Sequence, residues 1–362
     1  MAEIEDTPDL RPPADAVFEL IGGSLPSEPV MVDGGWPPPR VRSGRWLITQ
    51  IVREAILAIR SRRFWVDSAV VLLGSSLAAA VIVAVLSGAS ASGAAETWPW
   101  TYVLAAAILP ASASMLAVHW GLLGECRRDQ HDDGDLGRGL PLLATSVRGL
   151  IFAVLALTLQ LVLAALAGAS GRTAVAAALA VAVEFLVFGA IGTGVAALLK
   201  HPVRAGILGW VLAIALVAGN VAAVWALMPA VRSEDPVTVA INVKHGPFGE
   251  AVAYDCAPEA VGNAEIFHTE RIMWLAATNP VVIFTMMAAD TGLADGIPGW
   301  IPAALQSAGD GSQVPCVGGV PLVEDSMHAP LAAIGLALQG TLAALLLAAG
   351  QRSARRRLAT AA

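Results

Sequence analysis

Long apolar runs, separated by shorter polar segments, dominate this chain. Five of them lie before residue 230, and a sixth follows an interval of about a hundred residues. The runs cover about 66–87, 101–123, 149–167, 174–199, 205–228 and 330–350. Each is close to the roughly 20 residues that a helix needs to cross a hydrocarbon core, and none shows a polar face at 3.6-residue spacing. The pattern predicts an all-α polytopic membrane protein with six transmembrane helices.

The composition favours the same class. Charged residues make up 14% of the 362 residues and hydrophobic residues 56%, and the mean hydropathy is +0.67. Soluble domains carry about 25% charged residues. The deficit of charge indicates that lipid, rather than water, is the main solvent of this chain.

The basic residues are distributed unevenly among the segments that join the apolar runs. If the six spans begin and end on the inner side, the outer segments carry only Arg172, Arg232, Lys244 and Arg271. All the other lysines and arginines then lie in inner segments. Cytoplasmic segments of membrane proteins are enriched in Lys and Arg, so both termini are predicted to be cytoplasmic.

Two segments precede the first span. Residues 1–44 are acidic and then proline-rich. Such a segment buries too little apolar surface to offset the entropy of ordering it, so we expect a disordered cytoplasmic tail, with a docking role as the alternative.

Residues 45–63 place Ile48, Val52 and Ile59 on one helical face and Arg53 and Arg60 on the other. This amphipathic pattern is typical of a helix lying at the cytoplasmic interface; the alternative is a cytosolic continuation of the first span.

The remaining chain divides around a long outer segment. Residues 64–228 are predicted to hold transmembrane helices one to five, 330–350 the sixth, and 351–362 a basic cytoplasmic tail. Between them, 229–329 form a large extracytoplasmic segment between the fifth and sixth spans.

One stretch of that segment, 272–289, is nearly long enough to be a seventh span, which would place the terminal arginines outside. Asn279 and Pro280 lie at its centre, and proline lacks a backbone donor and disfavours helix at the preceding residue. We therefore expect two short helices, broken at Asn279 and Pro280, that are re-entrant into the outer leaflet or lie on it. A full span is the alternative.

The cysteines lie on both predicted sides of the membrane. Cys126 falls in a cytoplasmic loop, whereas Cys256 and Cys316 fall in the outer segment. Disulfides persist in oxidising compartments, so this division favours a Cys256–Cys316 disulfide over two free thiols. Such a bond would stabilise the fold by about 4 kcal/mol in the chain-entropy model.

The sequence offers no catalytic constellation. Neither Lys200 nor Lys244 follows the glycine-spaced pattern that cradles phosphates, and zinc-protease and serine-elbow motifs are absent. In the loop 124–141, His131 and nearby aspartates lack the calcium-loop pattern, which favours a solvated loop over a metal site. We expect this chain to bind no metal or cofactor and not to be an enzyme by itself.

A few polar residues interrupt the apolar runs. Glu184 lies near the middle of the fourth run, and Gln160, Asn220 and Gln339 lie in others. An ionisable residue at bilayer depth is costly and is a candidate for a transport pathway or proton relay. The alternative is a packing role, in which Glu184 hydrogen-bonds Asn220 or Gln160 on a neighbouring helix. Gly189, Gly192 and Gly194 would let another helix approach closely, which favours packing.

The order of these parts resembles the membrane subunit of type 2 ATP-binding-cassette (ABC) exporters, or permease subunit. A basic interfacial helix ending in RSRRFWV leads into the first of six spans, and a long outer segment precedes the last. Within it, residues 254–256, HTERIMWL (268–275) and NPVVIFTMMAAD (279–290) are similar to a stretch common in actinobacterial members. The resemblance covers roughly 45–350 in layout, while the matching motifs are short.

The resemblance implies a bacterial plasma-membrane location and an ATP-driven export function. It implies that 45–63 is an elbow helix and that a second permease subunit, identical or related, completes the pathway. A separately encoded cytoplasmic ABC ATPase would bind ATP and Mg. That ATPase would contact a coupling loop containing Glu125, Arg127, Arg128, Asp129 and Arg138. Membrane lipid is a further expected partner, and nucleic acid is not. The alternatives are an ion-driven secondary transporter and a non-catalytic subunit of another membrane complex; an intramembrane enzyme lacks residues to carry it.

Overall fold

The structure is a computed structural model that describes residues 44–88, 97–128, 140–199, 201–245, 251–290, 300–311, 316–317, 320–321 and 330–361. The predicted N-terminal tail, apart from Gly44, lies outside these residues. Residues Arg45–Ala362 form one compact unit.

Six helices in the described part of the chain are long and apolar enough to cross a membrane. They lie in α2 (Arg62–Gly88), α3 (Thr97–Arg128), α4 (Leu140–Leu166), α5 (Arg172–Leu198), the run formed by α6 (Pro202–Ile214) and α7 (Asn220–Leu227), and α11 (Leu331–Ala361). The prediction of a mostly helical chain with six span-length helices is confirmed. Several helices extend beyond the apolar runs, because polar residues at a helix end continue the same backbone hydrogen bonding.

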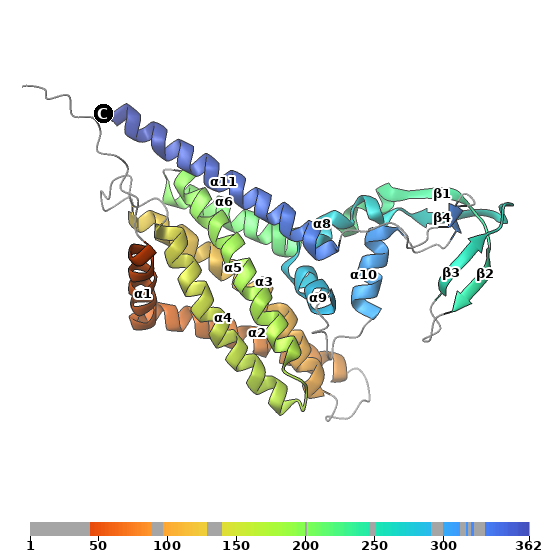
Figure 1. Ribbon diagram of the computed structural model, residues 1–362, viewed down its shortest axis with the longest axis horizontal. Coiled ribbons are helices and arrows are strands. Elements are labelled where there is room, and N and C mark those ends of the chain that lie inside the picture. The colour runs from red at the N-terminus through yellow and green to blue at the C-terminus, as the bar shows by residue number, and fades with distance from the viewer. Residues whose placement is uncertain are drawn as a thin grey trace, which may run out of the picture. The chain divides into compact units, whose positions relative to one another are not determined.

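Helix α5 lies at the centre of this bundle and packs against α3, α4 and α11 (Figure 1). Small residues let its backbone approach theirs. A Cβ atom on Gly192 would lie 2.6 Å from the Val118 carbonyl oxygen of α3, and one on Gly194 would lie 2.7 Å from the Leu346 carbonyl carbon of α11. The close helix approach predicted from these glycines is confirmed, and it explains why α5 is the most buried span.

The outer faces of the bundle are apolar and uncovered. Val70 and Leu77 of α2, and Val203 and Ile207 of α6, are each more than half exposed. Exposed branched side chains along a whole helix are unfavourable in water and suited to hydrocarbon. Lipid is therefore the solvent that these faces fit.

The run through α6 and α7 contains one π-helical turn, η3 (Ala215–Gly219). A π turn widens the helix and redirects backbone carbonyls away from their usual partners. The carbonyls of Leu216 and Val217 in this turn accept side-chain hydrogen bonds from Asn220 and Asn279. Met228–Val231 (η4) then ends the run in a 3-10 turn.

The amphipathic stretch before the first span forms a helix of its own, α1 (Gly44–Arg60). The chain is not helical at Ser61, whose hydroxyl accepts a hydrogen bond from the Phe64 amide at the start of α2. Serine commonly caps a helix in this way. The alternative of one uninterrupted helix does not match this break.

The segment between α7 and α11 begins with strands that the sequence analysis did not predict. The strands are β1 (Arg232–Val237), β2 (Ala240–His245), β3 (Ala251–Cys256), β4 (Gly262–Phe267), β5 (Cys316–Val317) and β6 (Val320–Pro321). β4, β1, β5 and β6 form one antiparallel sheet in that order, and β2 pairs with β3. In the β1–β4 pair, Arg232 lies opposite Phe267 and Val237 opposite Gly262.

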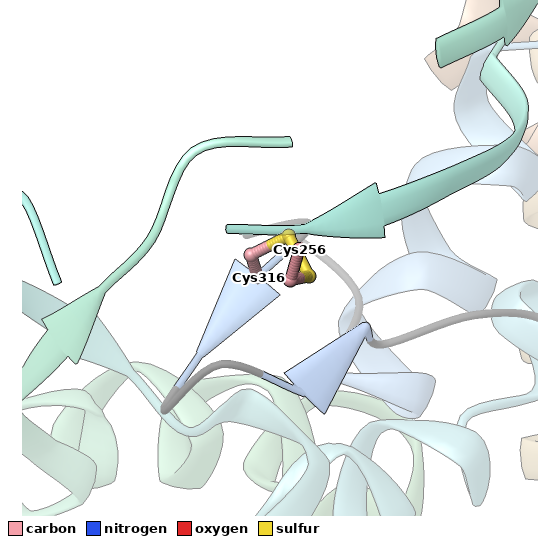
Figure 2. Close-up of a disulfide and its surroundings, with 2 residues drawn as sticks. All are labelled: Cys256 and Cys316. Atoms are coloured by element: carbon pink, nitrogen blue, oxygen red, sulfur yellow. A yellow bond between two sulfur atoms is a disulfide. The ribbon is translucent and has the colours of Figure 1, made fainter. Parts of the chain in front are cut away.

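A disulfide joins Cys256, at the end of β3, to Cys316, at the start of β5 (Figure 2). The two Cα atoms lie 5.7 Å apart and the residues are separated by 60 positions. The predicted disulfide is confirmed. It ties the β2–β3 hairpin to the four-stranded sheet, which contains β5.

Short helices lead from the sheet back to the bundle. They are η5 (Thr269–Arg271), α8 (Met273–Ala277), α9 (Pro280–Asp290) and α10 (Trp300–Asp310). The stretch 272–289 is thus two short helices with a non-helical step at Thr278 and Asn279, and neither helix is long enough to span a bilayer.

Candidate functional site

The four polar residues expected inside the membrane are all buried: Glu184, Gln160, Asn220 and Gln339. Two of them, Asn220 and Gln339, contact the non-helical step between α8 and α9, which is called the break from here on and consists of Thr278 and Asn279. Glu184 reaches the break through Gln339. The break is itself buried. Polar groups buried in a protein or a bilayer are costly unless they are hydrogen-bonded, so their partners decide what this region can do.

Local sequence explains the break. Asn279 accepts a hydrogen bond from the Val281 amide through Oδ1 at 2.8 Å, which makes it the N-cap of α9. Pro280 follows at the first helical position, where its missing N–H is not needed. Asparagine is a preferred N-cap, so the Asn-Pro pair ends one helix and starts the next.

The amide of Asn279 also reaches the α6–α7 run. Its Nδ2 donates to the Val217 carbonyl at 2.7 Å and to Asn220 Oδ1 at 3.2 Å. Asn220 in turn donates to Thr278 Oγ1 at 3.3 Å and to the Leu216 carbonyl at 2.7 Å. The break and the π turn therefore provide hydrogen-bond partners for polar groups that regular helix bonding leaves unpaired.

Helix α11 contacts the other side of the break. Gln339 Nε2 donates to the Thr278 carbonyl at 2.9 Å. One turn earlier, Gly335 packs directly on the Ala277 carbonyl, with no room for a Cβ atom. Residue 335 must therefore be glycine for α8 to end this close to α11.

Glu184 of α5 joins the same network from the bundle core. Ser114 Oγ of α3 donates to Glu184 Oε2 at 3.3 Å, and the Gln339 side chain also contacts this carboxyl group. Glu184 Oε1 and Gln339 Oε1 have no hydrogen-bond partner among the described atoms. The contacts of Glu184 come from neutral groups, which fits hydrogen-bonded packing better than an ion pair.

The expected partners of Glu184 were wrong. Asn220 turns toward the break instead, because the π turn brings it beside Thr278. Gln160 is buried on α4, and within the described chain no hydrogen bond joins it to Glu184. Ser114, which the sequence analysis missed, lies on α3, and the glycines of α5 let that helix pack close enough for Ser114 to reach Glu184.

The proposed coupling residues lie almost entirely outside the described structure. Asp129 and Arg138 fall outside the described residues, and the side chains of Glu125, Arg127 and Arg128 are likewise outside it. The backbone of α3 is helical up to Arg128.

Comparison with known proteins finds no family model that matches this chain and no curated protein sequence similar to it. The arrangement of buried polar residues is a set of hydrogen bonds that joins α3, α5, α7 and α11 to a helix break. Such a network can fix the position of the break relative to the spans.

Proposed function

We propose that this chain is the permease subunit of an ATP-driven type 2 ABC exporter. The observation that carries the proposal is the order of elements: a separate amphipathic helix, five span-length helices, a segment with a broken helix pair, and a sixth span. This is the layout noted from the sequence. The chain contributes the substrate pathway, and a partner ATPase contributes ATP and Mg binding.

The orientation rests on charge. Both termini and the loop 124–141 are cytoplasmic, because nearly all basic residues then lie inside. The segment 229–329 is extracytoplasmic, an oxidising location in which the Cys256–Cys316 disulfide is stable. In a bacterium this membrane is the plasma membrane.

Five exposed tryptophans support a membrane boundary at the outer end of the bundle. Trp98 and Trp100 begin α3, Trp225 lies near the end of α7, and Trp274 and Trp300 belong to α8 and α10. Since successive spans alternate in direction, the start of α3 and the end of α7 lie at the same end of the bundle. Tryptophan is enriched at membrane–water interfaces, which favours α8 and α10 at the outer interface with α9 re-entrant.

An interfacial α1 is part of the same proposal. Ile48, Val52 and Ile56 are exposed along one face of this helix. A face of this kind binds the headgroup boundary, and Arg53 and Arg60 add attraction to anionic lipid. Helix α1 then serves as the elbow that leads into the first span.

The hydrogen bonds around the break contribute to the proposed export function. The segment between the fifth and sixth spans forms the external gate, and the hydrogen bonds of Asn279, Asn220 and Gln339 fix that segment to the spans. Energy from ATP enters on the opposite side, through the loop 124–141. Of the predicted cytoplasmic connections between spans, this loop is the one long enough to form a docking element.

Charge reversal in the loop tests the proposal. Arg127→Glu with Arg128→Glu should weaken association of the ATPase and uncouple ATP hydrolysis from export, because a polar interface depends on charge complementarity. The matched control is Arg352→Glu with Arg355→Glu, the same change in the predicted cytoplasmic tail. Equal loss of ATPase association in both proteins would contradict the docking role of the loop.

A secondary transporter is the second candidate, and one observation favours it. Glu184 is fully buried within a span and keeps one carboxylate oxygen without a hydrogen-bond partner among the described atoms. An ion-driven transporter would use such a group as its proton or cation site. Glu184→Gln distinguishes the two: the permease keeps much of its transport, because glutamine retains the hydrogen bond from Ser114, whereas an ion-driven transporter loses it.

A further inference from the structure

Two strands of the sheet, β1 and β4, are joined at one histidine next to the bundle. β1 follows η4 at the end of the α6–α7 run, and β4 leads into η5 and α8. His268 is the residue between β4 and η5, and its backbone amide donates to the Val231 carbonyl at 2.9 Å, immediately before β1. His268 therefore lies where the chain leaves and re-enters the bundle. This histidine, with Ser233, Asp235 and Glu270, is called the neck cluster below.

Both ring nitrogens of His268 face a carboxylate. Nε2 lies 2.7 Å from Asp235 Oδ2, and Nδ1 lies 2.8 Å from Glu270 Oε1. A neutral imidazole has one N–H and one lone pair, so it can donate to only one of these acceptors. Only the imidazolium ion donates to both, and each bond is then charge-assisted.

Ser233 gives the cluster a second arrangement. Its hydroxyl lies 2.9 Å from His268 Nε2 and also 2.9 Å from Asp235 Oδ2. When the ring carries its proton, the Ser233 hydroxyl donates to Asp235. When Nε2 has released its proton to water, the same hydroxyl can rotate and donate to Nε2, and Asp235 then loses both of its donors.

The other charged groups at the neck leave this pairing in place. Arg271 lies 3.9 Å from Glu270, and Arg232 pairs with Glu265 across β1 and β4. From α10, Asp310 accepts a bond from Gln306, and the Ala308 carbonyl accepts one from Thr269 at 2.7 Å. The hydrogen bond to Asp235 is the main cause that raises the pKa of His268 above 6.5, and the hydrogen bond to Glu270 is the second cause. Hydrogen bonds from His268 and Ser233 lower the pKa of Asp235.

We propose that the neck cluster is a pH-responsive clasp, closed while His268 is protonated and loosened when it is neutral. The closed clasp holds β1 against η5, and η5 leads directly through α8 to the break that Gln339 and Asn279 fix to the spans. The side chain of His268 is about one-fifth exposed, so it exchanges its proton with the solvent that surrounds this segment. The clasp is a property additional to the proposed permease function, and the protonation of His268 does not depend on that function.

The direction of the pH dependence follows from the change in the pKa of each group on folding. Because the pKa of His268 is raised on folding, its contribution is present at low pH and is lost as pH rises through the folded-state pKa. The contribution of Asp235 is lost in the other direction, as pH falls through its lowered pKa. The clasp is therefore closed between the lowered pKa of Asp235 and the raised pKa of His268.

Hydrogen exchange of the purified full chain in nanodiscs, read by mass spectrometry at about pH 6 and about pH 9, tests the clasp. After correction for the intrinsic pH dependence of exchange, residues 232–237 and 262–272 should open more at the higher pH, by about tenfold for each pKa unit by which His268 is raised. His268→Gln, which cannot titrate, should open equally at both values.

Asp235→Asn keeps the shape of the cluster and removes one carboxylate, so it should reduce the pH response. Asp255→Asn is the matched control, because Asp255 bonds to Asn242 away from the neck, and it should keep the full response. If His268→Gln does not fold, the Asp235→Asn comparison provides the same test. An equal pH response in wild type and in either neck variant would overturn the clasp, whether or not the chain transports anything.

Discussion

Replacement of Asn279 by alanine is the most informative single change in the break. The asparagine caps α9 through the Val281 amide and donates to the Val217 carbonyl and to Asn220 Oδ1. Alanine leaves all three partners without that side chain. Because the break is buried, water cannot replace these bonds without entering the fold.

The structure sets the size of the effect. Loss of an N-cap costs about 1 kcal/mol. Each of the two bonds donated to a buried acceptor adds about 0.6 kcal/mol on average, and up to about 1.7 kcal/mol, by membrane-protein measurements. Asn279→Ala should therefore lower the free energy of unfolding by about 2–4 kcal/mol. Asn279→Ser keeps a capping oxygen and should recover about 1 kcal/mol of that loss.

Equilibrium unfolding of the purified chain in detergent, followed by intrinsic fluorescence, measures this effect. Asn263→Ala is the matched control, since Asn263 is exposed on β4 and its replacement should change stability by less than about 0.5 kcal/mol. If Asn279→Ala were as stable as Asn263→Ala, these hydrogen bonds would not hold the break, and the proposal that they fix the break to the spans would be refuted.

The remaining predictions concern packing, the disulfide and pH. Gly192→Val should prevent α5 from packing on α3 and abolish folded yield, whereas Gly74→Val, where a Cβ meets nothing within 4 Å, should leave yield unchanged on size-exclusion chromatography. Cys256→Ser should cost roughly 4 kcal/mol through loss of the loop closure; non-reducing mass spectrometry that finds both wild-type thiols open to alkylation would refute the bond. Thermal stability of wild type should fall as pH rises through the folded pKa of His268, and His268→Gln should remove that slope.

The helices could be predicted from sequence because lipid imposes a simple rule. A run of about 20 apolar residues has few alternatives to a membrane-spanning helix, and each of the six runs lies in such a helix. The step before Pro280 could be anticipated for a similarly local reason, since the proline ring restricts the residue before it.

The strands could not be predicted in the same way. β1 has the sequence RSEDPV, with two acids and a proline and none of the alternation of apolar and polar residues that marks a strand. Its partner β4 follows about 30 residues later, and the disulfide draws β5 from still further along the chain. Non-local pairing, rather than local propensity, forms this sheet.

The site was found only in part for a related reason. Burial of Glu184 and Gln339 follows from their apolar surroundings in the sequence, but their contacts depend on which helices pack together. Ser114 is one of several small residues in α3, and only the close approach of α5 selects it. The neck cluster joins His268 to Asp235 across 33 positions, and no local pattern reveals such a contact.

ATP energy is proposed to reach this chain through a separate subunit, and isolation of the assembled complex is the direct test. The tagged chain would be purified from its native membrane in mild detergent and its partners quantified by mass spectrometry, with ATP hydrolysis measured on the same sample. We predict a stoichiometric ATPase carrying the phosphate-binding loop that this sequence lacks, and less of that ATPase in the purified complex when Arg127 and Arg128 are reversed to glutamate. A chain that purifies without any nucleotide-binding partner, and that moves substrate in vesicles on an ion gradient alone, would contradict the proposal.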